Sequence, residues 1–140
     1  MHLYIAGPLF TQEERHKSKR IRDIAHEAGH TTFLPAEDGA IAFDTIHKGA
    51  NPKQTRQEVF DGDVDAIDAC DGIIAILDGR VPDEGMCIEL GMAHAKHKLC
   101  IGYLTDPRKL DEFGPNLMIE GCLSHLTHTN EELQALLKKL

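Results

Sequence analysis

Four acidic residues gather where a predicted strand passes into a predicted helix. Asp78, Asp83, Glu84 and Glu89 follow the apolar run at 73–77. Sites in α/β proteins form where the carboxyl ends of strands meet helix N-termini, so we expect these carboxylates near one site. Carboxylates placed there can act as nucleophile, general acid or general base. Acids are also favoured in the first turn of any helix, where Asp83 or Glu84 could serve only as a cap.

Glu89 is the acid in this group that local structure explains least. It lies inside the apolar stretch 86–93, where a solvated surface helix would alternate more evenly. A carboxylate there is either held for chemistry or is a partly exposed helix acid, and the pattern leaves both interpretations open.

The elements that must position these acids follow from hydrophobic periodicity and from glycine and proline breaks. Strands are predicted at 3–6, 31–34, 73–77 and 99–104, with a short edge strand at 125–127. Helices are predicted from Thr11 or Gln12 to Ala28, from Arg56 to Cys70, from Met86 to about Lys98, in a short piece within 113–119, and from Glu131 to Leu140 with Asn130 as cap. This order predicts a flavodoxin-like doubly wound sheet of about five mostly parallel strands with helices on both faces.

Two segments are less regular. Residues 36–57 lack periodicity and are predicted to form a long loop with at most one short helix. Because this loop follows the carboxyl end of a strand, we interpret it as a lid or binding loop rather than a flexible insertion. The helix at 56–70 carries four aspartates, which is unfavourable for a helix, and one of them is expected to face the site. They are Asp61, Asp63, Asp65 and Asp68.

Length and composition limit the possible functions. With 140 residues, of which 41% are hydrophobic and 27% charged, the chain is predicted to form a single domain over 1–140. A net charge of -8 repels nucleic-acid polymers. No apolar stretch approaches the ~20 residues of a membrane helix, and the N-terminus lacks a signal-peptide pattern. We therefore expect a cytoplasmic protein with neither a membrane nor a nucleic acid as partner.

Cysteine and histidine spacing gives no metal-binding pattern. The four cysteines show no CxxC spacing and fall in apolar contexts, which favours reduced core thiols. The histidine pairs at i,i+3 spacing lack the thiolates or carboxylates that would complete a zinc site. We expect no metal and no cofactor.

Four short motifs, in order along the chain, resemble the nucleoside 2-deoxyribosyltransferase family. They are Tyr4-Ile5-Ala6-Gly7, Asp63 eight residues before Asp71, Asp83-x5-Glu89-Leu90-Gly91, and Asn116-Leu117-Met118. The spacing from Glu89 to Asn116 also agrees with the family. Each motif is short, but the ordered set is specific and spans most of the chain, with weaker agreement at 36–57 and at the C-terminus.

The resemblance implies catalytic roles for four residues. Glu89 would be the nucleophile on the anomeric carbon, and Tyr4 would orient its carboxylate through a hydrogen bond. Asp63 and Asp83 would contact the sugar or the base edge, and one of them would help to protonate the departing base. We expect Asp83→Asn to slow base departure most.

The resemblance also implies substrate contacts from Gly7, Phe10, Asp38, Asn116 and Met118. Asn116 and Met118 would reach into a neighbouring subunit's site, where the Asn116 side chain would bind the 5'-hydroxyl. This implies a homo-oligomer built on dimers, up to a hexamer. Better-known members read the base with an amide in the loop after the second strand, where the nearest residues here are Glu37, Asp38 and Gly39, so the preferred base stays open.

The chemistry of N-glycosidic bonds accounts for such roles independently. Cleavage builds positive charge on the sugar, which a carboxylate beneath the ring stabilises and can capture covalently. A second, protonated carboxyl group assists the leaving base. A helix N-terminus would keep Glu89 ionised, while crowding by Asp63 and Asp83 would raise the pKa of one partner.

The resemblance predicts an enzyme that exchanges the base of 2'-deoxynucleosides with retention, and that hydrolyses them slowly without an acceptor base. Its ligands would be small deoxynucleosides and free nucleobases. One alternative is a 2'-deoxynucleoside 5'-monophosphate N-glycosidase, which needs a phosphate pocket that the residues around Asn116 and Gly7 do not suggest. A second is a non-catalytic nucleoside- or nucleotide-binding module on the same fold. A phosphoacceptor receiver domain is disfavoured because no acid follows the first strand.

Overall fold

The computed structural model describes residues 1–39, 49–106, 108 and 114–140. At its centre is a five-stranded sheet in the order β2-β1-β3-β4-β5, in which every pair is parallel. The strands are β1 (His2–Ala6), β2 (Thr31–Phe33), β3 (Gly72–Ile76), β4 (Leu99–Tyr103) and β5 (His125–Thr127). This is the flavodoxin-like strand order, and the predicted fold class and edge strand are confirmed.

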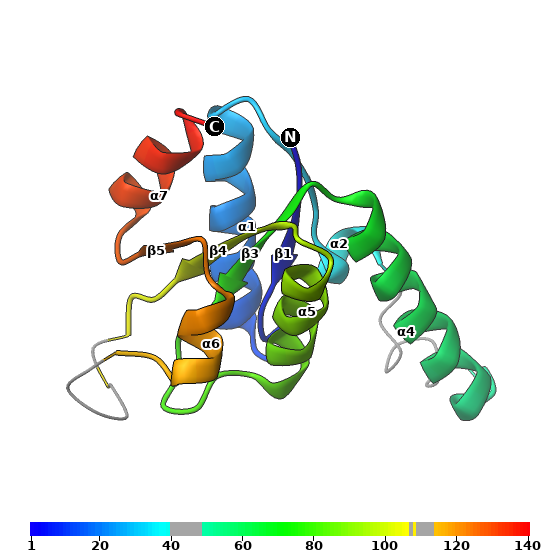
Figure 1. The fold of residues 1–140 in the computed structure, drawn as a ribbon. Helices are drawn as coiled ribbons and strands as arrows, with labels where there is room; N and C mark the ends of the chain where they lie inside the picture. The colour runs from blue at the N-terminus through cyan, green and yellow to red at the C-terminus, as the bar shows by residue number, and fades with distance from the viewer. Residues whose placement is uncertain (40–48, 107, 109–113) are drawn as a thin grey trace.

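Helices cover both faces of the sheet (Figure 1). One face carries α1 and α7, and the other carries α4, α5 and α6. The helices are α1 (Gln12–Glu27), the short α2 (Pro35–Asp38), α4 (Pro52–Ala69), α5 (Glu84–Ala95), α6 (Leu117–Cys122) and α7 (Asn130–Leu137). In the described ranges, none of these helices has the length and apolar character needed to cross a membrane.

Two hydrophobic cores form on the two faces because side chains alternate along each strand. In β1, Leu3 and Ile5 join the core beneath α1 and α7. Tyr4 and Ala6 point the other way, into the core beneath α5. The alternation therefore places the Tyr4 ring on the face that α4 and α5 cover.

The helix predicted to begin at Arg56 instead begins at Pro52. The Asn51 side chain caps it by accepting hydrogen bonds from two backbone N–H groups of the first turn, and proline suits the first helical position. The predicted loop at 36–57 is therefore wrong at its C-terminal end, whereas α2 is the one short helix that the prediction allowed. Its middle part, 40–48, lies outside the described residues.

Three further differences concern the ends of α7 and the start of α5. The N-cap of α7 is Thr129 rather than Asn130, because the Thr129 side chain accepts the bond from Glu132 N. That helix ends at Leu137 rather than Leu140. Helix α5 begins at Glu84, two residues before the predicted Met86, because Asp83 caps it. Glu89 consequently lies in the second turn of α5.

Candidate active site

Tyr4 and Glu89 form the centre of the site. The Tyr4 hydroxyl donates a hydrogen bond to Glu89 Oε1 at 2.8 Å. The Tyr4 side chain has no exposed surface, and its ring stacks on Phe33 with centroids 5.5 Å apart. Packing therefore fixes the position of the hydroxyl, and the hydroxyl in turn holds the carboxylate.

Burial dominates the electrostatics of Glu89. It raises the pKa of the Glu89 carboxyl to about 7, and the negative charges of Asp63 and Asp83 add to that rise. The hydrogen bond from Tyr4 acts in the opposite direction and favours the charged carboxylate. Burial therefore opposes the ionised form of Glu89 that a helix N-terminus was expected to favour, while the expected upward pKa shift from crowding by Asp63 and Asp83 is present.

Asp63 is the aspartate of α4 that faces this carboxylate. Burial raises the pKa of Asp63, and the nearby Tyr4 hydroxyl opposes that rise. Of the other three, Asp61 accepts a hydrogen bond from Gln57 on its own helix. Asp65 is exposed, and Asp68 pairs with Lys96. A carboxyl group with a raised pKa beside a second carboxyl group is suited to proton donation.

Asp83 combines two roles at the start of α5. Its Oδ1 accepts the N-cap hydrogen bond from Met86 N at 2.9 Å. The negative charge of Asp83 also raises the pKa of Glu89, so the Asp83 carboxylate lies near the site. Capping alone is sufficient to explain an aspartate at the start of a helix. One oxygen of the Asp83 carboxylate is already engaged in that cap.

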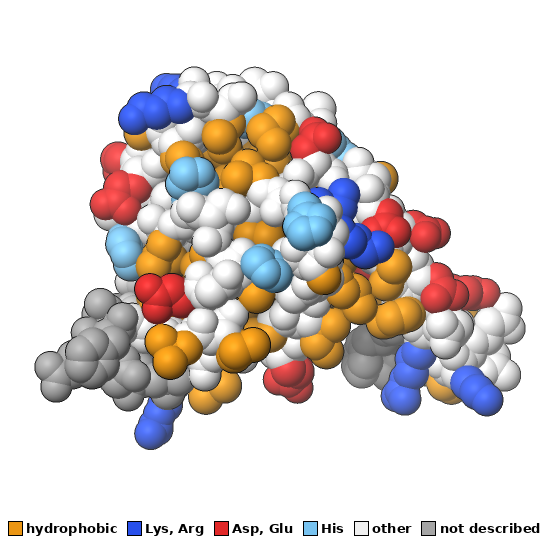
Figure 2. All heavy atoms as spheres, in the orientation of Figure 1, with side chains coloured by type: hydrophobic (Ala, Val, Ile, Leu, Met, Phe, Trp, Pro, Cys, Tyr) orange, Lys and Arg blue, Asp and Glu red, His pale blue; other side chains and the backbone are white. Residues whose placement is uncertain are grey.

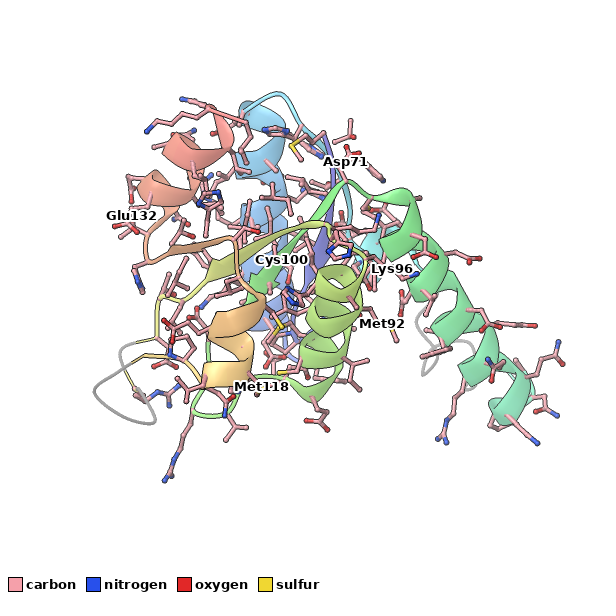
Figure 3. All side chains as sticks on the ribbon, viewed as in Figure 1. Asp71, Met92, Lys96, Cys100, Met118 and Glu132 are labelled. Carbon is pink, nitrogen blue, oxygen red and sulfur yellow. The ribbon has the colours of Figure 1, made fainter. Side chains whose placement is uncertain are left out.

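A cleft of about 340 Å³ separates α4 from α5 and contains both Asp63 and Glu89. Its walls are mainly apolar, and Figure 3 shows Met92 on the side of α5 that faces α4. Phe60 and Ile88 line it although 52% and 58% of their surfaces are exposed. The full lining is Arg56, Val59, Phe60, Asp63, Val64, Ile67, Gly85, Ile88, Glu89 and Met92. Two carboxyl groups thus lie beside apolar walls that suit a flat base.

The sequence did not identify the exposed part of this lining as functional. Val59 and Val64 are apolar residues of α4 that line the cleft. Arg56, Phe60 and Ile88 belong to no motif, because a single side chain on an exposed helix face carries no periodic signal. Only the relative placement of the two helices identifies them.

Asp78 does not join the other acids, contrary to the expectation of one cluster. Its Oδ1 accepts hydrogen bonds from the backbone N–H groups of Thr105 and Asp106, at 2.5 Å and 2.8 Å. Its Oδ2 accepts from Thr105 Oγ1 at 2.6 Å and pairs with Lys17. Burial raises the pKa of Asp78, but the hydrogen bonds from Lys17 and Thr105 outweigh burial, and the net effect is a lowered pKa. Asp78 therefore ties the end of β3 to the end of β4, and Glu84 is exposed.

Asn116 and Met118 lie on a different surface of the chain. The Asn116 side chain caps α6, with its Oδ1 accepting from Met118 N at 2.9 Å. Leu117 and Met118 are 80% and 79% exposed. Figure 2 shows hydrophobic side chains gathered along the lower edge of the molecule, over α6 and between α5 and α4. None of the three residues of this motif lines the α4–α5 cleft of the described chain.

The remaining predicted contacts have local structural explanations. At Gly7 a side-chain Cβ would lie 2.9 Å from the Cβ of Ile76, so packing requires glycine there. Phe10 is 76% exposed in the segment before α1. Asp38 Oδ2 accepts a hydrogen bond from Leu34 N at 2.7 Å and thereby closes α2. None of these residues lines the cleft between α4 and α5.

The described residues contain no cluster of side chains that could coordinate a metal ion. Across 1–39, 49–106, 108 and 114–140, no three histidine, cysteine, aspartate or glutamate side chains are grouped to hold an ion. All four cysteines are free thiols, with Cys70 and Cys100 buried.

Comparison with known proteins identifies a matching family. The nucleoside 2-deoxyribosyltransferase family model matches residues 3–134. A comparison with curated proteins finds no match.

Several solved structures share the fold over nearly the whole chain. A conserved protein from Enterococcus faecalis V583 is 24% identical with a TM-score of 0.84, and the match covers 99% of this chain and 98% of that one. A 2-deoxyribosyltransferase from Bacillus psychrosaccharolyticus is 24% identical with a TM-score of 0.78, over 98% and 96%. A CMP N-glycosidase from Clostridium botulinum is 21% identical with a TM-score of 0.60, over 97% and 98%.

Proposed function

Because the chain belongs to the nucleoside 2-deoxyribosyltransferase family, we propose that it exchanges the base of 2'-deoxynucleosides through a covalent 2-deoxyribosyl ester on Glu89. The observation that carries the proposal is the hydrogen bond from buried Tyr4 to Glu89, in a cleft that also contains Asp63. Small deoxynucleosides and nucleobases are the ligands on which this family acts.

In the first half-reaction, Glu89 attacks the anomeric carbon C1'. A Glu89 carboxylate oxygen forms a bond to C1' as the bond from C1' to the base nitrogen breaks, and its electron pair leaves with the base. Asp63 supplies the proton that neutralises the base. The carboxylate stabilises the positive charge that develops on the sugar. The product is a free base and a deoxyribosyl ester of Glu89.

In the second half-reaction, a nitrogen of a different base attacks C1' from the side that the first base left. The ester bond to Glu89 breaks, which regenerates the carboxylate, and the proton released by the incoming base returns to Asp63. Two displacements at C1' give net retention. Water in place of the second base gives slow hydrolysis. One nucleophile, one acid and one base pocket used twice therefore suffice.

Asn116 is proposed to complete the site of a second copy of the chain. Its Oδ1 is engaged by the α6 cap, which leaves the side-chain NH₂ to donate a hydrogen bond to the 5'-hydroxyl. The exposed Leu117 and Met118 beside it would be buried by such an association. A dimer, or a larger oligomer of dimers up to a hexamer, is the proposed active unit.

The test is a chromatographic assay of purified protein with 2'-deoxyinosine or thymidine, with and without adenine as a second base. New deoxyadenosine that appears only when adenine is present is the expected result. Release of free base without exchange, or only from a 5'-monophosphate, would instead assign the chain to hydrolysis. Absence of cleavage with every substrate would leave a binding module.

A further inference from the structure

Arg56 is the positively charged residue among those that line the α4–α5 cleft. It lies on α4 two helical turns before Asp63, which is about 10.5 Å along the helix axis at 1.5 Å per residue. Within the described part of the chain, its guanidinium takes part in no ion pair or hydrogen bond. Its donors are available to a ligand in the cleft.

The walls between Arg56 and Asp63 are suited to the face of an aromatic base. Phe60 and Val59 line the α4 side, and Ile88 and Met92 line the α5 side. A phosphate group would instead need several converging N–H donors, such as a glycine-rich turn or an open helix N-terminus. The apolar walls therefore favour a nucleobase over a phosphate as the group that reaches Arg56.

The order of groups along α4 is the same as the order of groups along one edge of a purine, and the long side chain of Arg56 must extend toward Asp63 to bring its guanidinium to that edge. On that edge N7 is near the glycosidic bond, and the substituent on C6 is farther from it. With C1' at Glu89, Asp63 is placed to protonate the near end of this edge, and Arg56 lies farther along the same helix. A guanidinium has only hydrogen-bond donors, so it can bond a carbonyl oxygen but not an amino group, which is itself a donor.

We propose that Arg56 selects 6-oxopurines, such as hypoxanthine, over 6-aminopurines by donating hydrogen bonds to the C6 carbonyl oxygen. This inference rests on the proposed function, because it requires the sugar at Glu89. It assigns base selection to α4 instead of the loop after β2. Two acids of that segment are engaged elsewhere, since Glu37 pairs with Lys19 and Arg22 of α1 and Asp38 binds Leu34 N.

The experiment compares kcat/KM for cleavage of 2'-deoxyinosine and 2'-deoxyadenosine, with cytosine as the common acceptor. The wild-type protein is expected to prefer 2'-deoxyinosine by about tenfold or more. Arg56→Gln is expected to lose or reverse that preference, because a glutamine amide matches the N6 and N7 groups of adenine. Lys53→Gln is the matched control, since it removes the same charge from an exposed position of α4 outside the cleft.

Different outcomes overturn different statements. Cleavage of neither substrate by the wild-type protein overturns the proposed function and, with it, this inference. Cleavage without preference, or an equal loss on both substrates in Arg56→Gln, overturns the role of Arg56 alone. The same holds if Arg56→Gln impairs only 5'-monophosphate substrates, which would make Arg56 a phosphate ligand. Circular dichroism and direct calorimetric binding of hypoxanthine and adenine separate these effects from misfolding.

Discussion

The hydroxyl of Tyr4 reaches Glu89 from a position 85 residues earlier in the chain, with the tyrosine ring wholly inside the core. The Glu89 carboxylate is thus held by a group that cannot itself move without disturbing β1. Burial, and then the charge of Glu89, raise the pKa of Tyr4 far above its ordinary value, so the phenol stays a proton donor at every working pH.

Tyr4→Phe should reduce kcat/KM near neutral pH by about tenfold, the size of one hydrogen bond to a charged group. The ring stack on Phe33 is retained, but the pKa of Glu89 rises because the bond that favours its charged form is lost. Steady-state kinetics between pH 5 and 9 measure both effects. Tyr103→Phe is the control, since its hydroxyl bonds Asn130 Oδ1 away from the cleft. Equal losses in the two variants would contradict a specific role for Tyr4.

Glu89→Ala should abolish base exchange, with a loss of about 10³-fold or more, while the fold stays intact. The reason is that the proposed sugar ester forms on the Glu89 carboxylate, which Tyr4 holds in the cleft. Mass spectrometry of quenched wild-type protein should show a peptide containing Glu89 that carries one deoxyribosyl unit. Exchange retained by the variant would mean that the nucleophile is another residue.

Glu89→Gln should stabilise the protein at alkaline pH. The pKa of Glu89 is about 7 in the folded chain and near its ordinary value when unfolded, so ionisation lowers the free energy of unfolding as pH rises from about 4.5 to 7. The gain from the neutral amide should be on the order of 3 kcal/mol at pH 8 and vanish below pH 4.5. Urea unfolding at both ends of this range measures it, with the exposed Glu84→Gln as control. A pH-independent difference would contradict the raised pKa.

Base release should slow as the pH rises through about 7. Glu89 and Asp63 form a coupled pair, and the reaction needs one proton on it, which is lost above the higher pKa. Asp63→Asn should slow base release by about 10²-fold in single-turnover experiments. Asp83→Asn should do less, because asparagine still caps α5. A larger loss in Asp83→Asn would return the acid role to Asp83, as first expected from the sequence.

Met118→Glu should convert an active oligomer into a weakly active monomer. Met118 is 79% exposed in the described chain, and a charge there opposes burial against a second copy. Sedimentation should show the loss of association, and the exchange assay should show at least about a tenfold loss. Leu140→Glu is the control, because the C-terminus lies at the opposite end of the molecule from α6 (Figure 1). A fully active wild-type monomer would contradict the shared site.

The strands could be predicted from the sequence because short apolar runs end at glycine, proline and aspartate. The run around Ile74 is an example, and its strand lies within one residue of the prediction at each end. Helix starts were predicted less well. Asn51 is the cap of α4 and Pro52 is its first residue, which is a common helix start signal. The same Asn-Pro pair also marks turns, so it does not indicate a helix unless a periodic stretch is recognised after it.

The candidate site could be predicted only in part, because short motifs identify single residues but not how the helices that carry them are placed. Tyr4, Glu89 and Asp63 could be named from motifs, and the structure places all three together. The helix pattern of 56–70 did not by itself distinguish Asp63 from the other three aspartates, because the rotation of α4 is not specified by composition; the family motif did. Gly7 and Asp38 have packing or capping roles that account for their residue types without a ligand.

The way that α4 leans away from α5 at its N-terminal end has a consequence for how such proteins diversify (Figure 1). The first half of this helix has one buried side chain, Thr55, so most substitutions there cost little stability. The groups proposed to break and form bonds, Glu89 and Asp63, lie at the other end of the cleft, where Tyr4 holds Glu89 from the core. A lineage built on this fold can therefore change which molecules it accepts through neutral surface drift, while the reaction it performs stays under strict selection.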